Sequence, residues 1–176
     1  MAIPSRKQTF GYTDCRDLVE KLDREIDRYS AVAGNNEKLE PEALLNLVHQ
    51  LTDSAFNAAV TAWQIGDWVF NDMTSQQRCK LGFKKVGDVQ KFAREQCRAL
   101  HLCRHAATAS KHWIVSEYAD PTVQVIVTGE GGWTVYFIDG DRKMRADLVF
   151  MIARDFWYHF IRDNEIASGG GAEHGT

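Results

Sequence analysis

Arginine and histidine residues gather in one stretch of the sequence, residues 88–112, whose apolar residues recur with the period of a helix. At about 100° per residue on a helical wheel, four of them share one stripe: Arg98, His101, His105 and His112. The opposite side carries the residues that should face the core: Phe92, Leu100, Cys103, Ala107 and Ile114. Arg104 flanks the stripe.

These side chains have the functional groups for chemistry on RNA. An arginine binds and neutralises a phosphate, and a histidine transfers protons near neutral pH. Together they suffice to cleave RNA through its own 2′-hydroxyl group, without a metal ion. A metal-independent nuclease is therefore one interpretation of the stripe.

The spacing within the stripe resembles that of the HEPN superfamily, helical bundles in which four to six residues separate an arginine from a histidine. Arg98 and His105 have six residues between them. Arg104 and His112 offer a second register with seven residues between them, and Arg104 is directly followed by a histidine, as the family prefers. Ala99 follows Arg98, where the family usually has Asn, Asp or His.

The resemblance covers the helical part of the chain, residues 13–118, and implies a function as well as a fold. Many members of the superfamily are endoribonucleases of toxin–antitoxin or phage-defence systems, and they act as homodimers whose paired helices bring two Arg/His sets together. It implies RNA cleavage or RNA binding here, with four candidate catalytic residues: Arg98, His105, Arg104 and His112.

Two further interpretations of the stripe remain open. It could be an ordinary solvated helix face, since amphipathic helices place polar residues opposite their core face. It could also belong to a non-catalytic interaction protein, such as an antitoxin, an inhibitor, a regulatory subunit or an assembly component. Such a protein would bind its partner through this face and through the aromatic C-terminal helix.

A metal site is the last alternative that the stripe suggests. Cys97, His101 and His105 follow one another at intervals of four residues, and the two histidines have the spacing that lets both imidazoles meet one ion. Cys97 lies about 12 Å along the helix axis from His105, however, which is too far to share an ion. We therefore expect neither a metal nor a cofactor.

Composition narrows the class of protein. The chain has 176 residues, of which 44% are hydrophobic, enough for a single domain with a sizeable core. A formal net charge of −3 gives no overall attraction to nucleic acid, so an RNA site has to be a local patch. Neither a signal peptide nor a membrane span is predicted, and we expect a cytoplasmic protein without membrane contact.

The elements expected around residues 88–112 define a mainly α, α+β fold. Helices are predicted over about 13–33 and 41–70, then a short one from Thr74 and one from Asp88 as its N-cap to 112. Alternating residues and Gly-rich turns predict an antiparallel β-meander at about 122–146, ahead of a last helix. The single domain should be a bundle of about four main helices over residues 1–167, with a disordered tail at 168–176.

Within the second helix the apolar residues predict an inward stripe: Leu44, Leu45, Val48, Leu51, Phe56, Ala59, Val60 and Trp63. Gly66 is expected to allow a kink.

Overall fold

The computed structural model describes residues 10–109 and 120–167. Residues 1–9, residues 110–119 with His112, and the predicted tail at 168–176 lie outside the described residues. In chain order the elements are α1 (Cys15–Ser30), α2 (Pro41–Asp72), α3 (Ser75–Leu81), α4 (Val86–Gln96), α5 (Arg98–Ala109), β1 (Val123–Thr128), β2 (Thr134–Asp139), β3 (Arg142–Arg145) and α6 (Ala146–Asp163). The predicted fold class, mainly helical with a small antiparallel sheet before the last helix, is confirmed.

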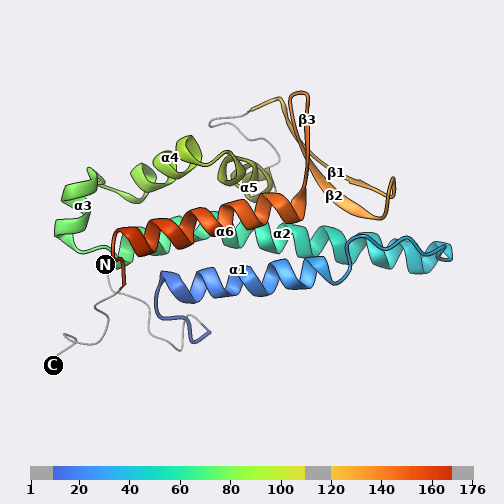
Figure 1. Cartoon of the computed structure of the whole chain (residues 1–176), viewed down its shortest axis with the longest axis horizontal. Coiled ribbons are helices and arrows are strands. Elements are labelled where there is room, and N and C mark those ends of the chain that lie inside the picture. Colours follow the sequence, from blue (N-terminus) through green and yellow to red (C-terminus); the bar gives the residue numbers. More distant parts are fainter. Residues whose placement is uncertain (1–9, 110–119, 168–176) are drawn as a thin grey trace.

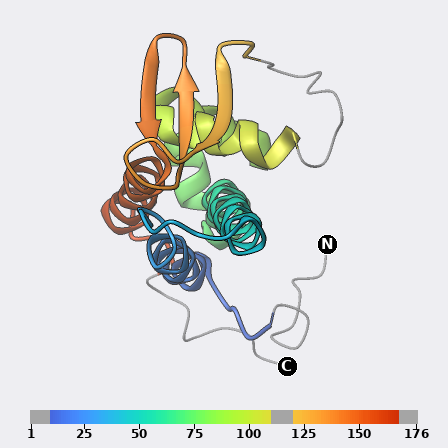
Figure 2. The same ribbon diagram turned by 90° about the vertical axis from the view of Figure 1, so that its right-hand side faces the viewer.

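Three long helices form the body of the fold. α1, α2 and α6 run side by side along the long axis of the molecule, and α1 contacts both of the others (Figure 1). Viewed along that axis, the three helices appear as a triangle, with α5 and the sheet on one side of it (Figure 2). α5 packs on α2 and α6 and also meets β1, so that it lies between the bundle and the sheet.

α1 begins and packs as its sequence predicts. Asp14 is its N-cap and accepts hydrogen bonds from the backbone of the first turn, which satisfies donors that a helix start leaves open. Its buried face includes Leu18, Leu22 and Tyr29. The Tyr29 hydroxyl lies 2.7 Å from Thr134 Oγ1 and accepts a hydrogen bond from the Val135 backbone N–H, at 2.9 Å. This side chain therefore ties α1 to strand β2.

α2 is continuous over 32 residues, and its predicted inward stripe is partly wrong. Leu45 and Phe56 are exposed, whereas Ala55, Ala58 and Ala62 are buried. The reason is that α2 contacts helices on several sides, and small side chains let those helices approach closely. The helix continues through Gly66, where the Trp157 ring packs, so that an added Cβ would lie 3.4 Å from it.

The predicted single helix over 88–112 is wrong. It is divided into α4 and α5 by Cys97, whose backbone is extended (φ −132°, ψ 104°). α4 follows the long axis of the molecule, and α5 runs across it (Figures 1 and 2). The change of direction buries Val89 and Ala93 of α4 as well as Leu100 of α5, so tertiary packing overrides local helix preference. Asp88 is not an N-cap: it lies in the first turn and accepts hydrogen bonds from the backbone before α4.

The β-meander is confirmed close to its predicted bounds. Its strands pair in the order β1-β2-β3, all antiparallel, with Phe137 opposite both Val125 and Met144. Val135 and Phe137 are buried, and β2 contacts α6 and α2. The sheet thus brings the start of β1 and the end of β2 next to α5.

No helix among the described residues is both long and apolar enough to cross a membrane.

Candidate functional site

A group of charged and polar side chains, here called the polar cluster, gathers where α5 meets the sheet. Its members are Arg98, His101, His105, Asp120 and Asp139. The first three come from α5, Asp120 lies three residues before the start of β1, and Asp139 is the last residue of β2. The antiparallel pairing places the beginning of β1 beside the end of β2, which explains why the two carboxylates meet.

Arg98 is held by both carboxylates. Its Nε donates to Asp139 Oδ2 at 2.8 Å, and its Nη2 donates to Asp120 Oδ2 at 2.9 Å and also to Asp139 Oδ1. The arginine side chain is still 46% exposed, so its outer edge faces solvent. Its hydrogen bonds are the main reason that the pKa of Asp139 lies below its usual value.

Asp120 is oriented by a turn of its own as well as by the arginine. Its Oδ1 accepts hydrogen bonds from both the backbone N–H and the hydroxyl of Thr122. Bonds from Thr122 and Arg98 hold the pKa of the Asp120 carboxyl well below its ordinary range. Asp120 is therefore a fixed, ionised carboxylate at the edge of the polar cluster.

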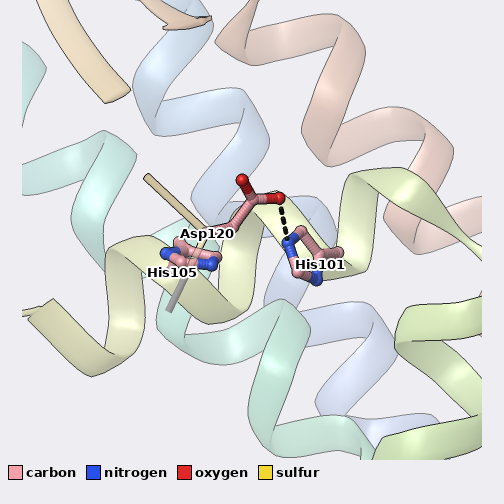
Figure 3. Close-up of side chains that lie close together, drawn as sticks. All are labelled: His101, His105 and Asp120. Carbon is pink, nitrogen blue, oxygen red and sulfur yellow. Dashed lines mark hydrogen bonds and ion pairs between the residues drawn. The ribbon is translucent and has the colours of Figure 1, made fainter. Parts of the chain in front are cut away.

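The two histidines lie on one turn of α5, below Asp120 in Figure 3. His101 Nε2 is 3.1 Å from Asp120 Oδ2, within hydrogen-bonding distance, and its ring centroid is 4.9 Å from that of His105. Burial lowers the pKa of His101, and the positive charge of Arg98 acts in the same direction, against the effect of Asp120. The His101 side chain keeps an exposed fraction of 12%.

His105 is the more buried of the pair. It is 8% exposed, and its buried Nε2 atom has no hydrogen-bond partner among the described residues. Burial is the first cause that lowers the pKa of His105, followed by the nearby charge of His101. A buried ring nitrogen whose lone pair or proton makes no hydrogen bond lowers the stability of the fold. Such groups concentrate at functional sites.

The structure describes three of the four predicted catalytic residues. Arg98 and His105 lie in one cluster, as their spacing suggested. Arg104 is buried, with 6% exposed, so it does not share the exposed side on which Arg98 lies. His112 lies outside the described residues. A fully solvated stripe is wrong for His105, which is buried on the helix that β1 contacts.

Two members of the polar cluster could not be recognised from the sequence. Asp120 stands before Pro121, an order typical of the end of a helix, and Asp139 stands before Gly140, an order typical of a hairpin turn. They stand 22 and 41 residues from Arg98, and no local spacing links them to it. Only the return of the chain through the meander brings them together.

Comparisons with known proteins give no match: no family model fits the chain, and neither the curated proteins nor the solved structures include a significant relative. Function therefore has to be inferred from the polar cluster itself. The cluster comprises a half-exposed cation, two imidazoles in contact and two ionised carboxylates. Such a set can bind an anion, move protons or hold a metal ion.

Proposed function

We propose that this protein is a metal-independent endoribonuclease of the HEPN-like kind, with the polar cluster as its active site. One observation carries the proposal: His101 contacts the ionised carboxylate of Asp120, while its neighbour His105 keeps an unpartnered Nε2. The two imidazoles thus have different surroundings, and different surroundings are what assign acid and base roles to a pair of titratable groups.

The roles follow from those surroundings. Burial and the charge of Arg98 lower the pKa of His101, but Asp120, which contacts its Nε2, favours the protonated form. We therefore assign His101 as the general acid and His105, whose pKa burial also lowers, as the general base. The base removes the proton of an RNA 2′-hydroxyl, whose oxygen forms a bond to the adjacent phosphorus while the bond from phosphorus to the 5′-oxygen breaks. The acid donates its proton to that 5′-oxygen. Arg98, half exposed, neutralises the charge that grows on the phosphate.

The structure bears on the choice between the two Arg/His registers. Because Arg104 is buried and Arg98 reaches solvent, the register of Arg98 with His105 is the better candidate for phosphate contact. Arg104 and His112 stay in the proposal as the second register. A homodimer, which would bring two such sets together, is also part of it.

Cleavage of labelled RNA in the presence of EDTA tests the proposal. We expect fragments that end in a 2′,3′-cyclic phosphate, and no cleavage where a single 2′-deoxynucleotide replaces the attacking residue. His105→Ala should reduce the rate by at least about 100-fold, and His112→Ala tests the second register. The matched controls are His49→Ala and His159→Ala, because both histidines are exposed, on α2 and α6. Full activity of the His105 and His112 variants would remove these histidines as catalysts.

A second candidate function has its own observation. Three large apolar side chains of α6 are exposed within two helical turns: Leu148 (49%), Met151 (45%) and Ile152 (39%). Contiguous apolar surface on a helix commonly marks a protein interface, so a non-catalytic interaction or regulatory subunit is the alternative. Two results together would support this alternative. The chain neither cuts nor binds RNA, and a single partner protein co-purifies with it at fixed stoichiometry but is lost in the variant Met151→Glu.

A further inference from the structure

We propose that His101, His105 and Asp120 form a binding site for one divalent transition-metal ion of the zinc class. Each residue offers one ligand atom, and the three atoms lie within 4.8 Å of one another. In Figure 3 the carboxylate of Asp120 stands over the two imidazoles of α5. Two neutral imidazoles and one carboxylate are a common set of protein ligands for such ions, with further positions left for water.

The geometry needs little change to receive an ion. Bonds of about 2.0–2.2 Å to nitrogen and oxygen place the ligand atoms of a tetrahedral ion roughly 3.3 Å apart. The separation between His101 Nε2 and Asp120 Oδ2 is already 3.1 Å. Since the widest separation among the three ligand atoms is at most 4.8 Å, a side-chain shift of about 1.5 Å closes the set around one ion.

His105 supplies the independent evidence that a ligand belongs here. The residue is more than nine-tenths buried and belongs to this ligand set, and its Nε2 has no hydrogen-bond partner in the part of the chain that the structure describes. Removing a polar nitrogen from water without a new partner is unfavourable. A metal ion would accept the lone pair of this imidazole and so remove that penalty.

A bound ion would have to displace one of the charged groups that now contact the three ligands. Arg98 Nη2 donates to the same Asp120 oxygen that lies next to His101, whereas Thr122 bonds to the other oxygen. An ion would thus take the place of Arg98 on Asp120 Oδ2. Arg98 would keep both of its bonds to Asp139, which lies outside the ligand set.

The composition of the ligand set and the charges near it indicate which kind of ion would bind. The ligand set has one carboxylate only, and the positive charges of Arg98 and the buried Arg104 lie near the two imidazoles. Magnesium and calcium need several oxygen ligands, so they fit this set poorly. Zinc, cobalt and nickel bind imidazole well, and the site should therefore prefer them.

This inference goes beyond the proposed nuclease function and needs no RNA to test it. The full-length protein is titrated with Co²⁺, followed by visible absorption, and with Zn²⁺, followed by calorimetry. We expect one ion per chain and a cobalt spectrum typical of nitrogen and oxygen ligands. Because the loss of supporting contacts already lowers metal affinity 10–100-fold, His101→Ala and Asp120→Asn should each lower it by at least about 100-fold.

Two comparisons make the titration decisive. His49→Ala and His159→Ala, which remove exposed histidines of other helices, should leave the affinity unchanged. Arg98→Gln should raise it by roughly tenfold, because the variant frees Asp120 Oδ2 and removes a nearby positive charge. Asp120→Asn alters no buried side chain of a helix, so it remains informative even if a histidine variant does not fold.

The proposal is overturned if wild-type protein binds no stoichiometric ion. It is equally overturned if Asp120→Asn and His101→Ala bind as tightly as wild type, which would assign the ion to histidines elsewhere in the chain. A lower affinity in Arg98→Gln would contradict the displacement of the arginine. RNA cleavage can fail while metal binding succeeds, and the reverse, so the two proposals stand or fall separately.

Discussion

The polar cluster differs from a second side-chain cluster of the same fold in how completely its groups are satisfied. That second group, here called the aromatic cluster, joins α6 to α4 and to the segment before α4: Phe83, Phe92, Phe156, Trp157 and Phe160. Neighbouring rings have centroid separations of 5.2–6.5 Å, typical of favourable aromatic contacts.

Trp157 shows how the aromatic cluster is completed. The residue is fully buried, and its indole N–H donates to the carbonyl of Ala62 at 2.8 Å. In the polar cluster, by contrast, the buried His105 Nε2 has no partner among the described residues, and Asp120 Oδ2 is shared by Arg98 and His101. The polar groups of the aromatic cluster are satisfied, whereas the polar cluster leaves a buried ring nitrogen unsatisfied. This contrast is expected between a core and a functional site.

The largest effect should come from breaking the aromatic cluster. Trp157→Ala removes a fully buried indole, so we expect the free energy of unfolding to fall by about 3–5 kcal/mol. Urea denaturation followed by circular dichroism measures it. Trp157→Phe, which keeps an aromatic ring in the space beside Gly66, should cost less than half as much. Equal losses in the two variants would show that packing is not what Trp157 contributes.

A smaller decrease in the free energy of unfolding is expected from the side chain of α1 that bonds to strand β2. Tyr29→Phe keeps the ring but leaves the Val135 N–H and the Thr134 hydroxyl without their partner, at a cost of about 1–3 kcal/mol. The same denaturation experiment applies, with Tyr158→Phe as the control because Tyr158 is exposed. If the two tyrosine variants are equally stable, the bonds of Tyr29 do not hold the sheet.

The ion pair of Arg98 with Asp139 should contribute less still. The pKa of Asp139 is depressed in the folded protein, so its contribution is present above the unfolded value, near 3.9, and is lost as the pH falls through the folded pKa. Since Arg98 is 46% exposed, we expect at most about 1 kcal/mol. Asp139→Asn should therefore lower stability slightly at pH 7 and converge with wild type once the pH has fallen below the folded pKa. A difference that stays constant as the pH is lowered would contradict an electrostatic origin.

The smallest change in stability is expected at His105. This prediction distinguishes the polar cluster from the aromatic cluster most clearly. Leu replaces the imidazole by an apolar side chain that needs no hydrogen bond, so His105→Leu should be within about 1 kcal/mol of wild type or more stable. Thermal unfolding measures it. Loss of 3 kcal/mol or more, the magnitude typical of a core substitution, would place His105 with the aromatic cluster as a structural residue.

The sequence was informative where structure depends on neighbouring residues. Helix α1 follows from Asp14 and its apolar period, and the meander follows from alternation and Gly-rich turns. The division at Cys97 carries no glycine or proline signal, because packing against the bundle dictates it. Arg98 and His105 could be chosen from spacing, whereas Asp120 and Asp139 reach them only through the folded sheet.

The proposed action of the polar cluster on RNA is tested most directly at Asp120, because only the fold connects this residue to the histidines. The measurement is the rate of RNA cleavage in EDTA at pH 7 by Asp120→Asn, beside Asp155→Asn as an exposed control. We predict a rate at least about tenfold below wild type, as expected when a general acid loses its supporting charge, in a variant that circular dichroism shows to be folded. Cleavage by Asp120→Asn at the wild-type rate would contradict an active site at the polar cluster.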